Sequence, residues 1–99
     1  MNELIKLEKD NLDTFMGHEN LIVVFSRDSC GACVQIKKHL IKLDEKYRVV
    51  LVDPIMHPKS SRFMPIPIDV YPKMALFNRG YFTKELKQID IINQNIDTI

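Results

Sequence analysis

Cys30 and Cys33 are the only cysteines of this 99-residue chain, and Gly31 and Ala32 separate them. Two thiols at this spacing can exchange with a disulfide, hold part of a metal site or attach a haem. The pair stands directly after the apolar run 21–25 and directly before a helical pattern. Unpaired N–H groups and a partial positive charge at a helix N-terminus stabilise a thiolate, which lowers the pKa of a thiol placed there. This context favours dithiol–disulfide exchange.

The other uses of a cysteine pair fit the sequence less well. A zinc site takes about four ligands, and the chain adds only His18, His39 and His57 to the two thiols. His39 faces elsewhere on the predicted helix, so a zinc site would need distant histidines or a dimer. Haem attachment requires a histidine directly after the second cysteine, where Val34 stands. We expect no metal and no cofactor, and keep a redox-inert binding module as the alternative function.

The helix after the cysteines shows which thiol faces the core. Apolar positions recur at spacings of three and four, which predicts one helical face: Cys33, Ile36, Leu40, Leu43 and Tyr47. This face buries Cys33 and turns Cys30 toward the exposed end of the helix. We therefore predict that Cys30 is the catalytic nucleophile and that Cys33 is the buried resolving thiol. Asp28 or Ser29 is predicted to cap this helix, although the Asp28 charge could instead raise the pKa of Cys30.

Two apolar runs, 21–25 and 49–52, lack alternation, which is typical of parallel strands covered on both faces. Further strands are predicted at 4–7, 73–78 and 81–83, the last two joined by a turn at Arg79–Gly80. These elements predict a single α/β domain over residues 1–99, in which helices flank a central mixed β-sheet on both faces.

Shorter elements complete this pattern. Asp10 or Asn11 is predicted to cap a short helix that ends at Gly17, and a helical turn is predicted near 59–63. Residues 55–69 are otherwise expected to be irregular, with a solvated His57. Near the C-terminus, the spacing predicts a helix whose apolar face consists of Ile89, Ile92 and Ile96.

Composition and charge narrow the partners and the compartment. The net charge of +1 gives no reason to expect binding to nucleic acid or to an anionic membrane. No apolar run approaches the roughly 20 residues of a membrane span, and the N-terminal segment is too charged for a signal peptide. We therefore expect a cytoplasmic monomer. A lone cysteine pair in such a reducing compartment is more often catalytic or metal-binding than structural.

The order of motifs resembles the thioredoxin superfamily along nearly the whole chain. The matching residues are Cys30-Gly31-Ala32-Cys33 after a core strand, Asp53-Pro54 after the next, Val70-Tyr71-Pro72 before the strand at 73–78, and Arg79-Gly80 at the hairpin turn. The resemblance implies a thioredoxin-like fold with a cis Tyr71–Pro72 bond facing the cysteines. It also implies substrate contacts from Ser29, Gly31, Ala32, Tyr71 and Pro72. The partners implied are a disulfide-containing protein substrate and a recycling reductase or low-molecular-weight thiol.

The chain departs from this family where the family carries helper groups. Val24 stands in place of a buried acid, Val49 in place of a lysine, and Ser29 in place of a tryptophan. Ala32 replaces a proline, and residues 83–86 carry no glycine-rich glutathione site. With no export signal and no histidine between the cysteines, we expect a protein that works mainly as a reductant. We also expect it to react more slowly at neutral pH than a typical thioredoxin.

Overall fold

The computed structural model describes residues 2–96, which form one five-stranded sheet. Its strands are β1 (Leu4–Lys6), β2 (Leu21–Phe25), β3 (Arg48–Val52), β4 (Lys73–Asn78) and β5 (Tyr81–Leu86). They lie in the order β1-β3-β2-β4-β5. The first three are parallel, and β4 and β5 are antiparallel to their neighbours. The predicted mixed sheet, its edge strand near the N-terminus and its hairpin are confirmed.

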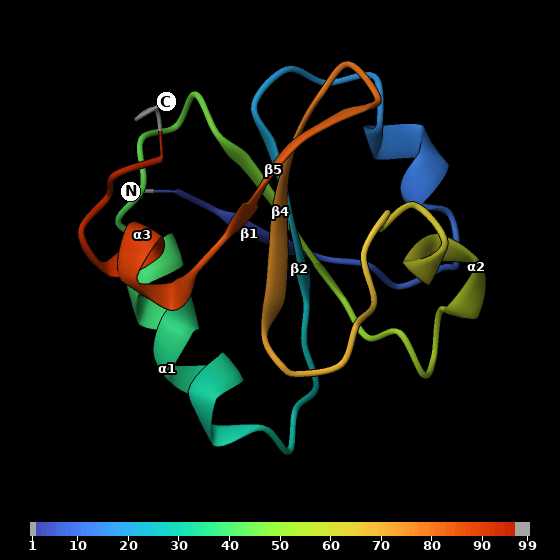
Figure 1. Cartoon of the computed structure of the whole chain (residues 1–99), viewed down its shortest axis with the longest axis horizontal. Helices are drawn as coiled ribbons and strands as arrows, with labels where there is room; N and C mark the ends of the chain where they lie inside the picture. The colour runs from blue at the N-terminus through green and yellow to red at the C-terminus, as the bar shows by residue number, and fades with distance from the viewer. Residues whose placement is uncertain (1, 97–99) are drawn as a thin grey trace.

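Helices cover both faces of the sheet (Figure 1). On one face lie α1 (Gly31–Leu40) and α3 (Gln88–Ile92), and on the other lie the 3-10 helix η1 (Leu12–Phe15) and α2 (Pro58–Ser61). Each layer encloses an apolar cluster. In β2, Ile22 and Val24 belong to one cluster, whereas Leu21, Val23 and Phe25 belong to the other. Because both sides of β2 are buried, its sequence shows no alternation.

Helix α1 ends earlier than the sequence predicts. Leu43 and Tyr47 are buried as expected, but they come from turns that follow Leu40. Asp44 stabilises these turns, because its carboxylate accepts a hydrogen bond from the Lys46 N–H at 2.8 Å and its carbonyl accepts one from the Tyr47 N–H at 3.1 Å. An aspartate that bonds to nearby backbone in this way competes with helix continuation.

The predicted apolar face of the C-terminal helix is also wrong. Ile91 is fully buried, whereas Ile89 and Ile92 are 58% and 45% exposed. Helix α3 has only five residues, so Ile96, which is buried, lies beyond its end. A helical spacing that runs from 89 to 96 therefore does not describe one face of a continuous helix.

Asp10 caps a different helix from the one predicted. Its carboxylate accepts hydrogen bonds from the N–H groups of Lys59 and Ser60, at 2.9 and 2.7 Å, and from the Ser60 hydroxyl at 2.6 Å. These donors belong to α2, which is far away in the sequence. Asn11 occupies the cap position of η1 but makes no capping bond through its side chain.

His57 is buried, in contrast to the solvated histidine expected. It precedes Pro58 at the start of α2, and its N–H donates to the Asp53 carbonyl at 2.9 Å. This turn directs the ring toward the end of β1, where Nε2 lies 3.0 Å from the Leu7 carbonyl oxygen. Only 5% of the residue's surface is exposed. The ring thus links α2 to β1.

Candidate active site

Cys30 lies where the chain leaves β2 and enters α1. It occupies the cap position of α1, and its Sγ accepts a hydrogen bond from the Cys33 N–H at 3.2 Å. The cysteine itself therefore caps the helix, and the predicted cap by Asp28 or Ser29 is wrong. Asp28 instead lies 3.6 Å from Lys6 Nζ, with 81% of its side chain exposed.

The two thiols differ in burial and in pKa. Cys33 is fully buried, whereas Cys30 is half-buried, and both are free. The pKa of Cys30 lies below its ordinary value, chiefly because the Cys33 thiol hydrogen-bonds to it, and the N–H groups of Cys33 and Ala32 act in the same direction. Burial, together with the neighbouring Cys30, raises the pKa of Cys33 to about 11. At neutral pH the outer sulfur is thus the better nucleophile.

This difference predicts selective alkylation. In the reduced native protein, iodoacetamide is expected to modify Cys30 more than about tenfold faster than Cys33, because a thiolate reacts and burial excludes the reagent from Cys33. Peptide mapping by mass spectrometry measures the two rates. In denaturant, where the burial of Cys33 is lost, the two rates should converge. Equal rates in the native protein would contradict the assignment of Cys30 as the nucleophile.

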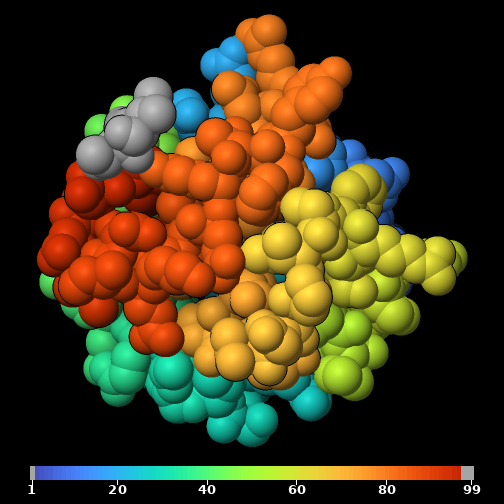
Figure 2. Space-filling view, in the orientation of Figure 1, coloured from blue at the N-terminus to red at the C-terminus, as the bar shows by residue number. Residues whose placement is uncertain are grey.

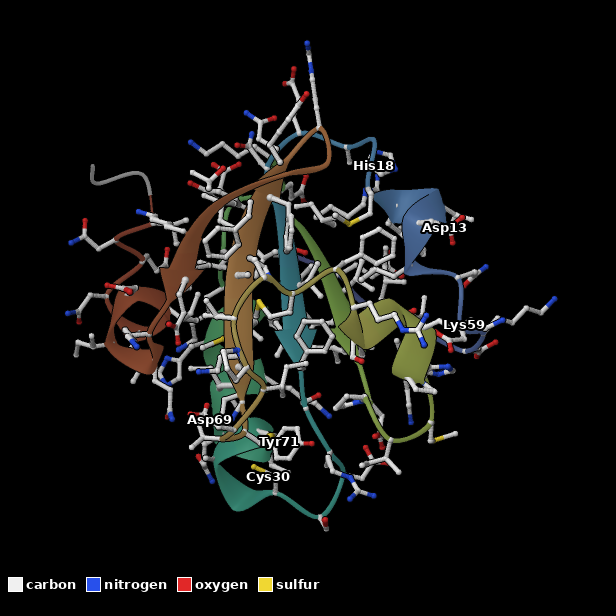
Figure 3. The ribbon with its side chains drawn as sticks, turned by 45° about the vertical axis from the view of Figure 1, so that its right-hand side comes forward. Asp13, His18, Cys30, Lys59, Asp69 and Tyr71 are labelled. Atoms are coloured by element: carbon white, nitrogen blue, oxygen red, sulfur yellow. The ribbon has the colours of Figure 1, made fainter. Side chains whose placement is uncertain are left out.

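The segment before β4 forms the second side of the site. The Tyr71–Pro72 bond is cis, as predicted. The Cys30 thiol donates to the Tyr71 carbonyl oxygen, with Sγ and oxygen 3.7 Å apart. Figure 3 shows Cys30, Tyr71 and Asp69 gathered at the same end of the molecule. Pro72 is buried, and Ser29 and Gly31 are exposed beside the outer thiol. Ala32 is half-buried, and the substrate contacts of these residues stay predictions.

A groove of about 510 Å³ adjoins this second side. Tyr71 forms part of its wall, and the carbonyl oxygen of the same residue accepts the hydrogen bond from Cys30. Figure 2 shows the segment between α2 and β4 covering the surface beside the start of β4. The remaining wall is mostly apolar: Pro54, Met64, Pro65, Ile66, Pro67 and Ile68, with Ser61 and Arg62. Such a groove can receive an extended polypeptide.

The core behind the cysteines is apolar where the resemblance leads one to expect charges. Val24 and Val49 are both fully buried in the cluster that contains Ile36 of α1. Neither can accept a proton from Cys33. The high pKa of Cys33 is therefore set mainly by burial.

Lys73 is a buried charge that the sequence interpretation missed. Only 11% of its side chain is exposed, and its Nζ lies 3.0 Å from Asp69 Oδ1 and 3.3 Å from Glu85 Oε2. Glu85 also pairs with Lys87 at 3.2 Å. The bond with Asp69 is the main reason why the pKa of Lys73 lies above its ordinary value. A lysine at the start of an apolar strand, four residues after an aspartate, was the available signal.

Two further observations concern metal binding and membrane-spanning helices. Within residues 2–96, no group of three or more His, Cys, Asp or Glu side chains is arranged to hold a metal ion. Over the same residues, no helix is both long and apolar enough to cross a membrane.

The structure is similar to solved thioredoxins. Thioredoxin f2 from Chlamydomonas reinhardtii aligns with a TM-score of 0.73 and 23% identity over 98% of this chain and 100% of its own. Oxidised mitochondrial thioredoxin 3 from Saccharomyces cerevisiae aligns with a TM-score of 0.76 and 18% identity over 96% and 95%. The zinc-bound form of human ERp44 aligns with a TM-score of 0.67 and 18% identity, over 93% of this chain but only 30% of ERp44.

By sequence, neither a protein-family model nor a curated protein matches this chain. The fold is nonetheless the thioredoxin fold, with the cysteine pair in a CxxC arrangement at the start of α1.

Proposed function

We propose that this protein is a thiol–disulfide oxidoreductase that reduces disulfides in polypeptides through Cys30 and Cys33. The observation that carries the proposal is a pair of free thiols one helical turn apart, of which Cys30 caps the start of α1 in a half-buried position and Cys33 is fully buried. In keeping with this geometry, the pKa of Cys30 is lowered and that of Cys33 is raised. A nucleophile must ionise readily, whereas a resolving thiol is needed only after the first bond has formed. The thioredoxin fold supports the same reaction class.

The reaction proceeds in two exchanges. The Cys30 thiolate attacks one sulfur of the substrate disulfide, forms a mixed disulfide and releases the other substrate sulfur as a thiolate, which takes up a proton. Cys33 then loses its proton and attacks Cys30 Sγ, which releases the second substrate thiolate. The substrate gains two electrons and two protons, and the protein is left with a Cys30–Cys33 disulfide. A reductase or a low-molecular-weight thiol returns it to the dithiol.

The groups that lower the Cys30 pKa support the reducing direction. Among the described residues, the lowering comes from Cys33 and Ala32 rather than from a cationic side chain. Strong oxidants owe their potential to a strongly stabilised reduced form, and here the groups that stabilise the Cys30 thiolate are hydrogen-bond donors of Cys33 and Ala32. A reductant of this kind acts where thiols are kept reduced, so we propose a cytoplasmic location and action as a monomer.

Reduction of insulin disulfides by dithiothreitol, followed by turbidity, tests the function. We expect the wild type to accelerate the reaction and Cys30→Ser to fall to the uncatalysed rate, because the remaining thiol, Cys33, is fully buried and has a raised pKa. Val34→Ser is the matched control on the exposed side of α1 and should retain activity. Equal rates for the wild type and Cys30→Ser would instead support the redox-inert binding module.

A further inference from the structure

We propose that Lys73 is a positioning residue, which clamps the turn at residues 69–72 so that Tyr71 stays beside Cys30 when a polypeptide substrate binds. The proposal rests on the proposed function and names a residue that the thiol chemistry itself does not require. Lys73 does not contact the reacting sulfur in the described structure. Its effect is exerted through the backbone of the turn that it anchors.

The backbone of Lys73 lies at the end of the sheet where β2 leads to Cys30 and where the turn with Tyr71 leads into β4. Lys73 is the first residue of β4 and pairs with Phe25, the last residue of β2. Cys30 follows Phe25 by five positions, and Tyr71 precedes Lys73 by two. A side chain that starts here can therefore tie the turn to the sheet without reaching into the thiol site.

The ammonium group makes this tie through two carboxylates. Its bond to Asp69 at 3.0 Å closes a loop around Val70, Tyr71 and Pro72. Its bond to Glu85 at 3.3 Å connects the same nitrogen to the neighbouring strand β5. The Lys73 side chain is 11% exposed and that of Glu85 is 25% exposed, so solvent screens this pair less than it screens pairs on an open surface. The Asp69 side chain is 67% exposed, so the arm to the turn depends on the sheltered position of the ammonium group.

The clamped turn supplies two features of the site. The Tyr71 carbonyl oxygen accepts a hydrogen bond from the Cys30 thiol, and Tyr71 also forms part of the wall of the groove. A polypeptide that occupies the groove has to present its sulfur to Cys30 at the same time, so misplacement of the turn would weaken a productive complex. A small aromatic disulfide needs only the sulfur of Cys30. The clamp should therefore matter for polypeptide disulfides and not for small ones.

The test compares two substrates in the same variants. Lys73→Met keeps the apolar stem and removes the charge, whereas Lys73→Arg keeps a cation that can pair with both carboxylates. We expect Lys73→Met to lower kcat/KM for insulin by about tenfold or more, while the rate with 5,5′-dithiobis(2-nitrobenzoate) stays within about twofold. Lys73→Arg should restore most of the insulin activity. Asp69→Asn, which weakens the bond between Lys73 and the turn, should reproduce the selective loss of insulin activity.

Lys38→Met, on the exposed side of α1, is the matched control and should leave both rates unchanged. Equal losses with the two substrates, or no rescue by arginine, would show that Lys73 only supports the fold and would overturn the proposal. If the wild type reacts with the small disulfide but does not reduce insulin, the proposed function fails instead. In that case, hydrogen exchange at the Val70 and Tyr71 amides tests the clamp without an activity assay. Faster exchange in Lys73→Met supports the clamp, and unchanged exchange rejects it.

Discussion

Replacing Cys33 with serine is expected to stop the exchange halfway, with the substrate covalently attached to Cys30. The hydroxyl that replaces the buried thiol cannot attack the mixed disulfide, so the intermediate accumulates. The Sγ atom of Cys30 lies in the half-buried outer position, which a substrate sulfur can reach. Non-reducing electrophoresis and intact-mass measurement after incubation with oxidised insulin detect the adduct.

Cys30→Ser is the matched control for this trapping experiment. It retains the buried thiol but removes the accessible one, so it should form no adduct under the same conditions. The variant that carries both substitutions measures the background of nonspecific adduct formation. Adduct formation by Cys30→Ser but not by Cys33→Ser would reverse the assigned roles of the two thiols.

The resolving step is expected to accelerate roughly tenfold from about pH 7 to about pH 8. Only the thiolate of Cys33 attacks, and below its pKa the thiolate fraction rises about tenfold for each pH unit. The pKa of Cys33 is raised to about 11 from an ordinary value of 9.0, with burial as the largest cause. Burial persists when Cys30 is held in a mixed disulfide, so this pH range remains below the Cys33 pKa.

A preformed mixed disulfide between Cys30 and 5-thio-2-nitrobenzoate isolates this step. Attack by Cys33 releases the coloured thiolate, whose absorbance gives the rate at each pH. Cys33→Ser should release none and serves as the control. A rate that does not change with pH would mean that another group takes the Cys33 proton, and would contradict the apolar environment assigned to it.

The attack by Cys30 should depend on pH differently from resolution. The pKa of Cys30 lies below its ordinary value, so its thiolate fraction levels off at a lower pH than that of Cys33. The sequence alone predicts a slow reaction at neutral pH, and the raised pKa of Cys33 leads us to expect that the second exchange is the slow one. Val24, in place of an acid, leaves no proton acceptor for Cys33 at that position.

Much of the architecture could be predicted because its signals are local. The doubly apolar runs of β2 and β3 predict buried parallel strands, and the cysteine pair after β2 places the thiols at a helix start. The position of Pro72 before β4, interpreted through the family resemblance, predicts the cis bond that the structure contains. Each of these features depends on residues next to one another in the chain.

Several of the features that were missed depend on partners far away in the sequence. His57 is buried with its Nε2 3.0 Å from the Leu7 carbonyl oxygen, and Asp10 caps α2 rather than η1 because the fold brings the two segments together. The charge of Lys73 is accommodated by Glu85 of the next strand. A single sequence shows the chemical type of each of these residues, but their pairing appears only once the sheet is assembled.

The capping of α2 by Asp10, which lies far from it in the sequence, has a consequence for local unfolding. Four residues are too few to remain helical by themselves, and the backbone donors at the start of α2 are satisfied by Asp10, while Ser60 Oγ accepts from the Leu12 N–H at 3.2 Å. If either segment departs, the hydrogen bonds of Asp10 and Leu12 with α2 are lost. We therefore expect residues 10–12 and α2 to unfold locally as one unit, and the groove wall that follows α2 to lose its support when they do.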